Sequence, residues 1–214
     1  MLSEDTINEM KQMLMKTTGV KHYNGWNNRT TFGYHSFDLM NFKVNGQRNP
    51  LERLAIMKEH VDFDGKTIID FGCNSGGMLF HLPEISRGFG LDFNMECIKS
   101  AQCFKDKLNM NHLHFHKQDL NTFNLSDFKN QNKIPVIDIV FLLALGSWIK
   151  NWEQLYTDSL AYAETIVLET NNDTEGIPQL ELFRSLNATV TLISDASLDD
   201  TTLNHGRKTY IIRK

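Results

Sequence analysis

The sequence is poor in the residues that mark disordered, disulfide-bonded or membrane-spanning proteins. Its 214 residues include 4 Pro and 13 Gly, which disfavours a disordered or fibrous chain. The three cysteines, Cys73, Cys97 and Cys103, match neither a disulfide framework nor a four-ligand zinc pattern, and they fit a reducing compartment. No run of about 18 apolar residues occurs, and the N-terminus lacks a signal-peptide pattern. We therefore expect a cytoplasmic protein that has no membrane partner.

An excess of basic residues is also lacking. The chain has 22 Lys and Arg against 26 Asp and Glu, a formal net charge of −4. A large nucleic-acid footprint needs a surplus of Lys and Arg, so the balance disfavours one, although a local basic patch stays compatible with it. The length fits one domain with a sizeable core. The oligomeric state is not indicated by any feature of the sequence.

The first 50 residues read differently from the rest of the chain. Residues 4–16 have the apolar spacing of a helix. Residues 17–50 look irregular and are rich in Asn, Gly and aromatic side chains. A long segment of that kind in a compact domain is typical of a lid or binding loop. Within one structural domain, we assign residues 1–50 to an N-terminal helix and a substrate and cofactor lid, and residues 51–214 to a cofactor-binding domain.

From residue 50 onward, short apolar runs alternate with helical segments. We predict strands at 67–72, 88–93, 113–119, 136–144, 165–169, 189–194 and 208–212, and helices at 50–60, 76–82, 94–108, 152–162 and 178–186. Such alternation implies a mostly parallel sheet that is covered by helices on both faces. No helix-length segment separates the last two strands, so they are expected to pair as an antiparallel hairpin. The expected fold class is α/β, with a Rossmann-like sheet of seven strands.

The most informative motif is the run from Asp70 to Gly77, Asp-Phe-Gly-Cys-Asn-Ser-Gly-Gly. It leads from a predicted strand through a glycine-rich turn into a helix, and glycines let the backbone turn sharply and approach a ligand closely. Cys73 and Asn74 break the dinucleotide pattern G-x-G-x-x-G, and no Gly-Lys-Ser/Thr follows as in a P-loop. Both departures count against NAD and ATP as ligands.

Two acidic residues stand at the ends of the next two predicted strands. Asp92 follows Gly72 by twenty residues and can accept hydrogen bonds from both ribose hydroxyls of an adenosine. Asp119 ends the third predicted strand, where it can meet the adenine edge. An acid at a strand end is often only a turn former. Here, however, the turn and both acids share the carboxyl edge of the sheet, which is where α/β proteins bind ligands.

On these motifs, residues 66–120 resemble the cofactor half of the class I S-adenosylmethionine (SAM)-dependent methyltransferases. The resemblance extends over about residues 50–214, with Asp138–Leu143 similar to the family's fourth-strand motif. It implies that Asp70 and the turn residues Gly72, Asn74 and Gly76 hold the methionine end of SAM, and that Asp92 with Phe93 meets the ribose. It also implies that Asp119 with Leu120 flanks the adenine, and that Leu143, at the start of residues 143–148, faces the methyl group.

The fourth-strand motif also departs from well-known subfamilies. Leu143-Ala144-Leu145-Gly146 contains no Asn-Pro-Pro-Tyr or Asp-Pro-Pro-Tyr run, which disfavours methylation of a planar amino group. No Pro-Cys dipeptide is present, which disfavours methylation at cytosine C5. The family fold by itself leaves the substrate open.

The front segment has a second resemblance. Tyr34–Phe37 followed by Gly46–Arg48 is similar to the region ahead of the cofactor domain in the tRNA wobble-uridine carboxymethyltransferases and their smaller relatives. In those enzymes this region covers the SAM pocket. The resemblance keeps RNA open as a partner, and carboxy-SAM open as the form of the cofactor.

Several polar residues near the predicted edge have two readings each. Arg48 is a clamp for the methionine carboxylate or a solvated surface residue. His35 is a general base or a histidine packed in an aromatic lid. Glu169 is a second candidate base, or part of a polar turn. The alternating His112, His114 and His116 are read as one strand's side chains rather than as metal ligands, so no metal is expected.

Four further residues are candidate substrate contacts. Tyr34 lies in the lid, Trp148 follows the fourth predicted strand, and Asn171 follows the fifth. Arg207 precedes the last strand, where it reaches an anionic substrate or is solvated. Together these residues favour methyl transfer to an oxygen or nitrogen of a small metabolite or sugar-like molecule. The alternatives are an RNA-modifying wobble-uridine type enzyme and a SAM-binding protein without transferase activity.

Overall fold

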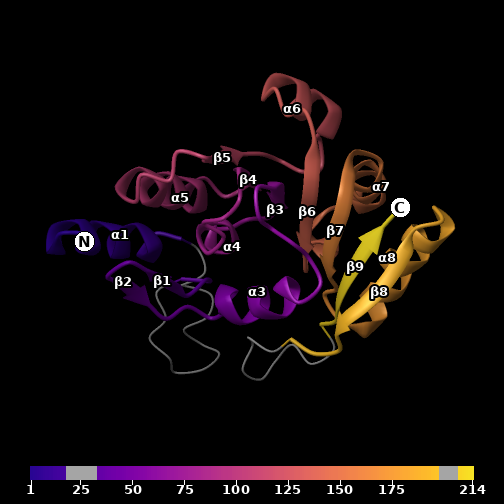
Figure 1. Cartoon of the computed structure of the whole chain (residues 1–214), viewed down its shortest axis with the longest axis horizontal. Helices are drawn as coiled ribbons and strands as arrows, with labels where there is room; N and C mark the ends of the chain where they lie inside the picture. Colours follow the sequence, from indigo (N-terminus) through magenta and orange to yellow (C-terminus); the bar gives the residue numbers. More distant parts are fainter. Residues whose placement is uncertain (18–32, 198–206) are drawn as a thin grey trace.

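A computed structural model describes residues 1–17, 33–197 and 207–214 (Figure 1). Its centre is a seven-stranded sheet, and a two-stranded hairpin lies apart from this sheet. The strands of the hairpin are β1 (Phe37–Leu39) and β2 (Phe42–Val44). The strands of the large sheet are β3 (Thr67–Phe71), β4 (Arg87–Asp92), β5 (Leu113–Lys117), β6 (Ile137–Leu143), β7 (Ala163–Glu169), β8 (Thr189–Ser194) and β9 (Thr209–Arg213).

The large sheet has the strand order β5-β4-β3-β6-β7-β9-β8. The first five strands of this order pair in parallel, and β9 pairs antiparallel with both β7 and β8. From β3 the chain adds β4 and β5 on one side, and then returns to add β6 and β7 on the other side. In open α/β sheets the ligand crevice forms at such a switch point, which here lies at β3. The predicted seven-stranded, mostly parallel sheet with an antiparallel C-terminal hairpin is confirmed.

Helices cover both faces of the sheet (Figure 1). They are α1 (Glu4–Met15), α3 (Pro50–Lys58), α4 (Gly77–Phe80), α5 (Met95–Lys107), α6 (Leu125–Gln131), α7 (Trp152–Tyr162) and α8 (Asp173–Ser185), with a short 3₁₀ turn η1 (Gly146–Trp148). One core layer joins α1, α3, α4, α5 and the β1–β2 hairpin to one face, and a second joins α6, α7 and α8 to the other. The alternation of side chains along each strand sends neighbouring residues into different layers: Ile68 belongs to the first and Ile69 to the second.

Asparagine side chains fix where several helices begin. Asn49, Asn94, Asn124 and Asn172 each accept a hydrogen bond from a backbone N–H in the first turn of α3, α5, α6 and α8. Such a cap satisfies one of the free donors at a helix start and contributes about 1 kcal/mol. Asn94 and Asn172 follow β4 and β7, so each cap also sets how sharply the chain leaves the carboxyl edge of the sheet.

The observed elements differ from the predicted ones mainly in the front segment. Residues 17–50 are not wholly irregular, since they contain the β1–β2 hairpin, and α6 was not expected. Both omissions have the same cause: strands of three residues and a helix of seven are too short to show a clear period. The aromatic residues Tyr23, Trp26 and Phe32 of the predicted lid lie outside the described residues. Among the described residues, no helix is both long and apolar enough to cross a membrane.

Candidate active site

The turn after β3 has the backbone geometry that the glycine-rich motif predicts. Gly72, Asn74 and Gly76 all have positive φ values, of 73°, 51° and 78°. A side chain at Gly76 would start 2.6 Å from Phe115 Cε1, so only glycine fits there. The N–H groups of Gly72 and Cys73 both donate to the carbonyl of Leu91, which ties the turn to β4. The turn therefore has a fixed backbone conformation at the end of the central strand.

Asp92 is built into the same turn. Its Oδ2 accepts a hydrogen bond from Asn74 N at 2.9 Å, and its Oδ1 accepts one from Asn94 N at 2.8 Å. Burial raises the pKa of this carboxyl, while the two backbone donors act in the opposite direction. A carboxylate has about four acceptor sites, so these two bonds leave acceptor capacity for hydroxyl groups of a ligand.

Asp70, in β3 ahead of the turn, is almost completely buried, and its Oδ2 has no hydrogen-bond partner. Burial raises the pKa of Asp70 to about 8, with Arg53 opposing this shift and Asp92 adding to it. A buried acceptor that lacks a donor costs free energy, and a cationic amine of a ligand would satisfy it. This orphaned carboxyl oxygen and the free acceptor capacity of Asp92 are the groups that an amino acid joined to a nucleoside requires.

The described front segment, residues 33–49, which the sequence predicts as part of a lid, lies directly against the start of α4. Tyr34 and Arg48 are joined through backbone hydrogen bonds, and His35 and Arg48 form a short β-bridge. The His35 ring fills the space over Gly77, where a Cβ would lie 2.4 Å from His35 Cγ. Burial, helped by the charges of Arg53 and Arg48, lowers the pKa of His35 well below its usual value. His35 is therefore a neutral imidazole, and its Nδ1 is buried without a partner.

A buried cluster of charged residues connects the lid to the end of β7. Arg48 Nη2 donates to both carboxylate oxygens of Glu169 at 3.1 Å, and Arg53 Nη2 donates to Oε2 at 2.8 Å. Arg207 Nη1 lies 3.7 Å from Oε1. Arg48 is 2% exposed, so the reading of Arg48 as a solvated surface residue is wrong. Glu169 is buried as well and is a partner of the lid rather than part of a polar turn.

Arg53 is a residue of this cluster that the sequence reasoning missed. It lies in α3, between the buried residues Pro50 and Met57 and next to Leu54. An arginine on the buried stripe of a helix is unusual, because charged residues are almost never fully buried unless they are paired. The sequence signal for a buried Arg53 was its helical spacing from the apolar residues Pro50, Leu54 and Met57. Its partner, Glu169, lies 116 residues later in the chain.

The ends of β6 and β7 are joined by Asn171. Ala144 has a φ of 54°, its N–H donates to Glu169 O at 2.8 Å, and its carbonyl accepts from Asn171 Nδ2 at 2.9 Å. The left-handed conformation is strained for any residue other than glycine, so these two bonds hold Ala144 in place. Asn171 Oδ1 is buried and has no partner.

The other predicted site residues lie nearer the surface. Phe93 and Trp148 are 73% and 78% exposed, and Asp119 is exposed too. Asp119 Oδ1 accepts from the backbone and the side chain of Asn121, bonds that lower its pKa. Leu120 and Leu143 are partly buried against the second and the first core layer, respectively. Exposed aromatic rings beside a ligand edge have the surface that stacks on a planar or sugar-like group.

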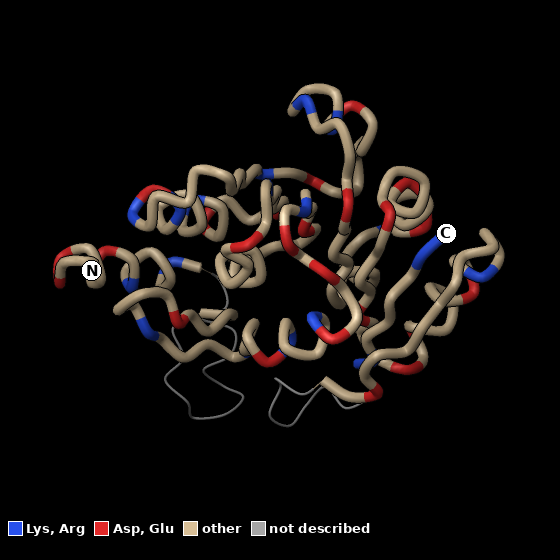
Figure 2. Tube along the Cα trace, viewed as in Figure 1, with Lys and Arg blue, Asp and Glu red and all other residues tan. Residues whose placement is uncertain are grey.

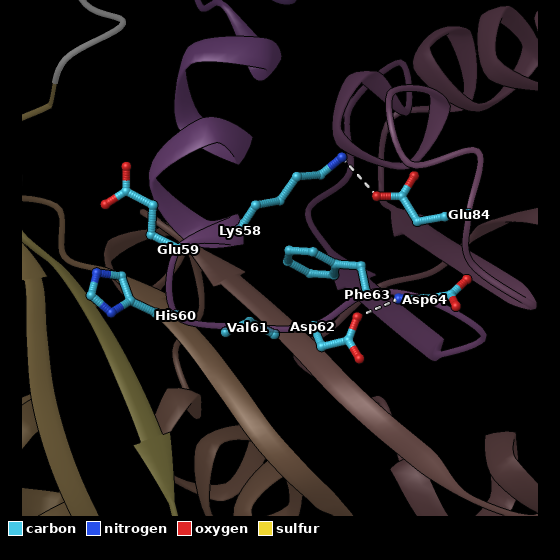
Figure 3. A pocket seen from close by; sticks show the side chains of 8 residues that line it. All are labelled: Lys58, Glu59, His60, Val61, Asp62, Phe63, Asp64 and Glu84. Atoms are coloured by element: carbon cyan, nitrogen blue, oxygen red, sulfur yellow. Dashed lines mark hydrogen bonds and ion pairs between the residues drawn. The ribbon is translucent and has the colours of Figure 1, made fainter.

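One cavity in the described part of the chain lies away from these groups. It has a volume of about 420 Å³ and is lined by Lys58–Asp64 and Glu84 (Figure 3). These residues precede β3 and β4, so this hollow is at the amino edge of the sheet, opposite the glycine turn. Its polar groups pair with one another: Lys58 Nζ contacts Glu84 Oε1 at 2.6 Å, and Asp62 Oδ1 accepts from Asp64 N. A smaller cavity opens onto Arg53 and Glu169.

Neither metal nor disulfide chemistry is indicated in the described parts of the chain. Cys73 and Cys97 are buried, Cys103 is partly buried, and burial raises the pKa of all three thiols. Within residues 1–17, 33–197 and 207–214, no group of three or more His, Cys, Asp or Glu side chains could hold a metal ion. His114 and His116 instead stack against Phe89.

Comparisons with known proteins concern the family and the fold of the chain. A family model described as a methyltransferase domain matches residues 62–196, and a search of curated proteins found no match. The bifunctional kinase-methyltransferase WbdD is 14% identical with a TM-score of 0.66, and the match covers 95% of this chain and 46% of that one. The chain thus spans about half the length of WbdD.

Two other solved structures match more of their own length. The N-terminal domain of EvdMO1, solved with S-adenosylhomocysteine (SAH) bound, is 13% identical with a TM-score of 0.62, and the match covers 97% of this chain and 96% of that one. Precorrin-6y C5,15-methyltransferase from Geobacter metallireducens GS-15 is also 13% identical, with a TM-score of 0.58 and coverages of 83% and 95%. At these identities the likeness concerns the fold.

The front segment is outside the matched range. Because the family model begins at residue 62, the resemblance of Tyr34–Phe37 and Gly46–Arg48 to the wobble-uridine enzymes stays a prediction. The family model spans more than half of the chain and includes the glycine turn, both strand-end acids and β8. The chain therefore belongs to the class I SAM-dependent methyltransferase family, and SAM is its cofactor.

Proposed function

We propose that this enzyme transfers the methyl group of SAM to an oxygen or nitrogen of a small metabolite or sugar-like acceptor. The observation that carries this proposal is the buried contact of Arg48 with Glu169, which closes the front segment over the end of β7. A front segment that is buried against the sheet suits an enclosed, small acceptor. In this proposal residues 1–50 act as the lid of the cofactor domain formed by residues 51–214.

The cofactor residues follow the carboxyl edge from β3 to β5. Asp70 and the turn Gly72, Asn74 and Gly76 take the methionine end, and Asp92 takes the ribose hydroxyls. Phe93, Asp119 and Leu120 border the adenine, and Leu143 faces the methyl group. The free acceptor capacity of Asp92 and the orphaned Oδ2 of Asp70 support this order. We propose that Arg48 lies beside the methionine carboxylate while its guanidinium stays paired with Glu169 and so ties the lid to β7.

The protein's own contribution is positioning. When bound, SAM supplies a methyl group that its positive sulfur already activates. The buried lid residues exclude water, and the rigid strand ends hold the acceptor in line with the methyl group. Because Asn171 Nδ2 is tied to Ala144 O, its Oδ1 is a fixed acceptor for a hydroxyl or amine of the substrate. Tyr34 and Trp148 supply aromatic walls.

A general base is needed only when the acceptor atom carries a proton of high pKa. We propose His35 for this role, since its Nδ1 has no partner and the lowered pKa keeps the ring unprotonated, in the form that can accept a proton. Glu169, the other candidate base, already accepts hydrogen bonds from Arg48 and Arg53. Its oxygens are therefore less accessible to a substrate proton, and we assign Glu169 a positioning role.

RNA is the second candidate acceptor, on the resemblance of the front segment to the wobble-uridine enzymes. Figure 2 shows basic positions scattered among acidic ones along the described trace, which favours the small acceptor. A non-catalytic SAM-binding protein is the third candidate. The three unpaired thiols support a reducing, cytoplasmic location.

A transfer assay separates the three candidates. The wild-type protein and His35→Gln are incubated with methyl-tritiated SAM and either a small-metabolite extract or total tRNA. We expect label in the metabolite fraction, and its loss in the variant while SAH binding is retained. Label confined to tRNA would replace the metabolite proposal by the RNA one. SAH binding with no transfer to either pool would favour a non-catalytic protein.

A further inference from the structure

Arg207 is a mostly buried arginine with an unused donor. Its side chain is 17% exposed, and its Nε–H is buried without a hydrogen-bond acceptor. A buried N–H without an acceptor is destabilising, and more so when the group is charged. A group at this position that offers an oxygen would remove the penalty.

Glu169 does not fill this role. Arg207 Nη1 is 3.7 Å from Glu169 Oε1, beyond hydrogen-bond distance, whereas Arg48 and Arg53 donate to the same carboxylate at 2.8–3.1 Å. Glu169 therefore binds the lid and α3 first, and Arg207 is left at the margin of the cluster. The ion pair with Glu169, at 3.7 Å, places the guanidinium near the carboxyl edge of the sheet.

The position of Arg207 in the sheet separates it from the expected methionine end of SAM. Glu169 pairs with Thr209, and Thr170 exchanges hydrogen bonds with Lys208, so Arg207 stands across from Asn171 at the carboxyl edge. The strand order β3-β6-β7-β9 puts β9 three strands away from the glycine turn. Neighbouring strands are about 4.8 Å apart, which makes this separation about 14 Å.

Hydroxyl groups line the surface next to the same cluster. The small cavity over Glu169 and Arg53 is bordered by Ser194, Ser197 and Thr209. Ser197 Oγ accepts a hydrogen bond from Arg48 Nη2, and Ser194 Oγ donates to Ala196 O. Arg207 is not among the residues that border this cavity, so the hydroxyl groups mark a polar surface beside the cluster, and anion binding depends on Arg207 itself.

We propose that the acceptor substrate carries an anionic group, a phosphate ester or a carboxylate, that accepts a hydrogen bond from Arg207 Nε. The guanidinium holds this group beyond β9 while the atom to be methylated lies at the ends of β6 and β7. This inference rests on the proposed function and narrows its substrate class to anionic small molecules. Arg207 is then a specificity-determining residue of the acceptor site.

The test uses calorimetric titrations in two stages. SAH is first titrated into the wild type, Arg207→Gln, Arg207→Lys and Arg213→Gln. Inorganic phosphate and acetate are then titrated separately into each SAH-saturated protein at low ionic strength. Arg213 is the matched control, since it lies at the other end of β9 and donates to Thr165 Oγ1 and His60 O.

We expect one of the anions to bind the SAH complex of the wild type and of Arg213→Gln. Arg207→Gln should weaken this binding about tenfold or more, and Arg207→Lys, which keeps the charge without the Nε–H, by less. Binding of phosphate alone indicates a phosphate ester, and binding of acetate alone indicates a carboxylate. Arg207→Lys supplies the comparison if Arg207→Gln does not fold.

Three results would overturn the inference. Neither anion binds although SAH binds normally, or Arg207→Gln and Arg207→Lys bind the anion as tightly as the wild type. In the third, the anion binds only when SAH is absent, which would assign Arg207 to the cofactor carboxylate. Failure of SAH itself to bind would instead contradict the proposed function, so the two failures are distinguishable.

Discussion

The two halves of the candidate site are built in different ways. On the cofactor side, the groups that bind one another are close in sequence or on adjacent strands: Asp92 holds Asn74 and Asn94, and the turn is bonded to Leu91. On the lid side, Glu169 binds Arg48 and Arg53, residues 121 and 116 positions away. The first half is a strand-end motif, whereas the second exists only after the chain has folded.

This difference sets what each half contributes. Backbone donors satisfy most of the cofactor side, so its geometry is fixed by the turn and changes little when one side chain is altered. The lid side depends on a buried ionic cluster, in which removing one partner leaves the others uncompensated. Damage to the lid side should therefore reduce stability, and damage to the cofactor side should reduce binding.

Glu169→Gln should give the largest effect, because it leaves the buried guanidinium groups without their shared carboxylate. We expect a loss of about 3–5 kcal/mol in the free energy of unfolding, measured by denaturant titration. Glu164→Gln, at an exposed position of the same strand, is the control and should change stability little. A stable Glu169→Gln protein that has lost only transfer activity would restore Glu169 as a general base.

The pH dependence of stability tests Asp70. In the unfolded chain the pKa of an aspartate is about 3.9, and in the folded protein burial raises the pKa of Asp70 to about 8. Between these values the folded protein holds a proton that the unfolded chain has released. The free energy of unfolding therefore falls as pH rises, by up to about 1.4 kcal/mol per pH unit, and levels off above the folded pKa.

Denaturant titrations without SAM, at several values between about pH 5 and pH 8, measure this slope. Asp70→Asn should remove it, so that the variant becomes the more stable protein toward the upper end of the range. Asp64→Asn, which changes an exposed carboxyl group, should keep the wild-type slope. An unchanged slope in Asp70→Asn would show that another group is responsible.

Asp92→Asn sharpens the comparison from the cofactor side. The amide keeps the shape of the side chain and loses one acceptor oxygen, so we expect SAH affinity to fall about thirtyfold, or about 2 kcal/mol. One of the two backbone N–H donors to Asp92 also loses its acceptor, so stability should fall by about 1–3 kcal/mol, less than in Glu169→Gln. Calorimetric titration measures the affinity. Asp119→Asn is the matched strand-end change and should have a smaller effect, since Asp119 is exposed. Equal effects of the two variants would contradict the assignment of the ribose to Asp92.

Ala144→Gly should give the smallest effect, and a stabilising one. Ala144 has a φ of 54°, so glycine relieves backbone strain and should add about 0.5–1 kcal/mol to the free energy of unfolding. Ala161→Gly, at an exposed position in α7, should lose about 1 kcal/mol because glycine disfavours a helix. Thermal unfolding of both variants reports the difference, and loss of stability in Ala144→Gly would mean that Ala144 is unstrained.

The sequence predicted the fold where its signals were long and regular. Each of the seven strands of the large sheet was expected within one or two residues at its ends, because each is an apolar run bounded by turn residues. The β1–β2 hairpin and α6 were missed because short elements carry no resolvable period. Glycine at positions 72 and 76 also predicted the turn after β3, since the left-handed backbone conformation found there favours glycine.

The sequence by itself determined the family and the cofactor, and it predicted the edge of the sheet at which the site lies, because these depend on local motifs at consecutive strand ends. Only the tertiary structure decided that Arg48 and Glu169 are partners, that Arg53 joins them, and that Arg207 is left beside them. The physical reason is that burial creates these relations. An arginine and a glutamate more than a hundred residues apart have no reason to meet until the packing of the lid, α3 and β7 removes water from around both.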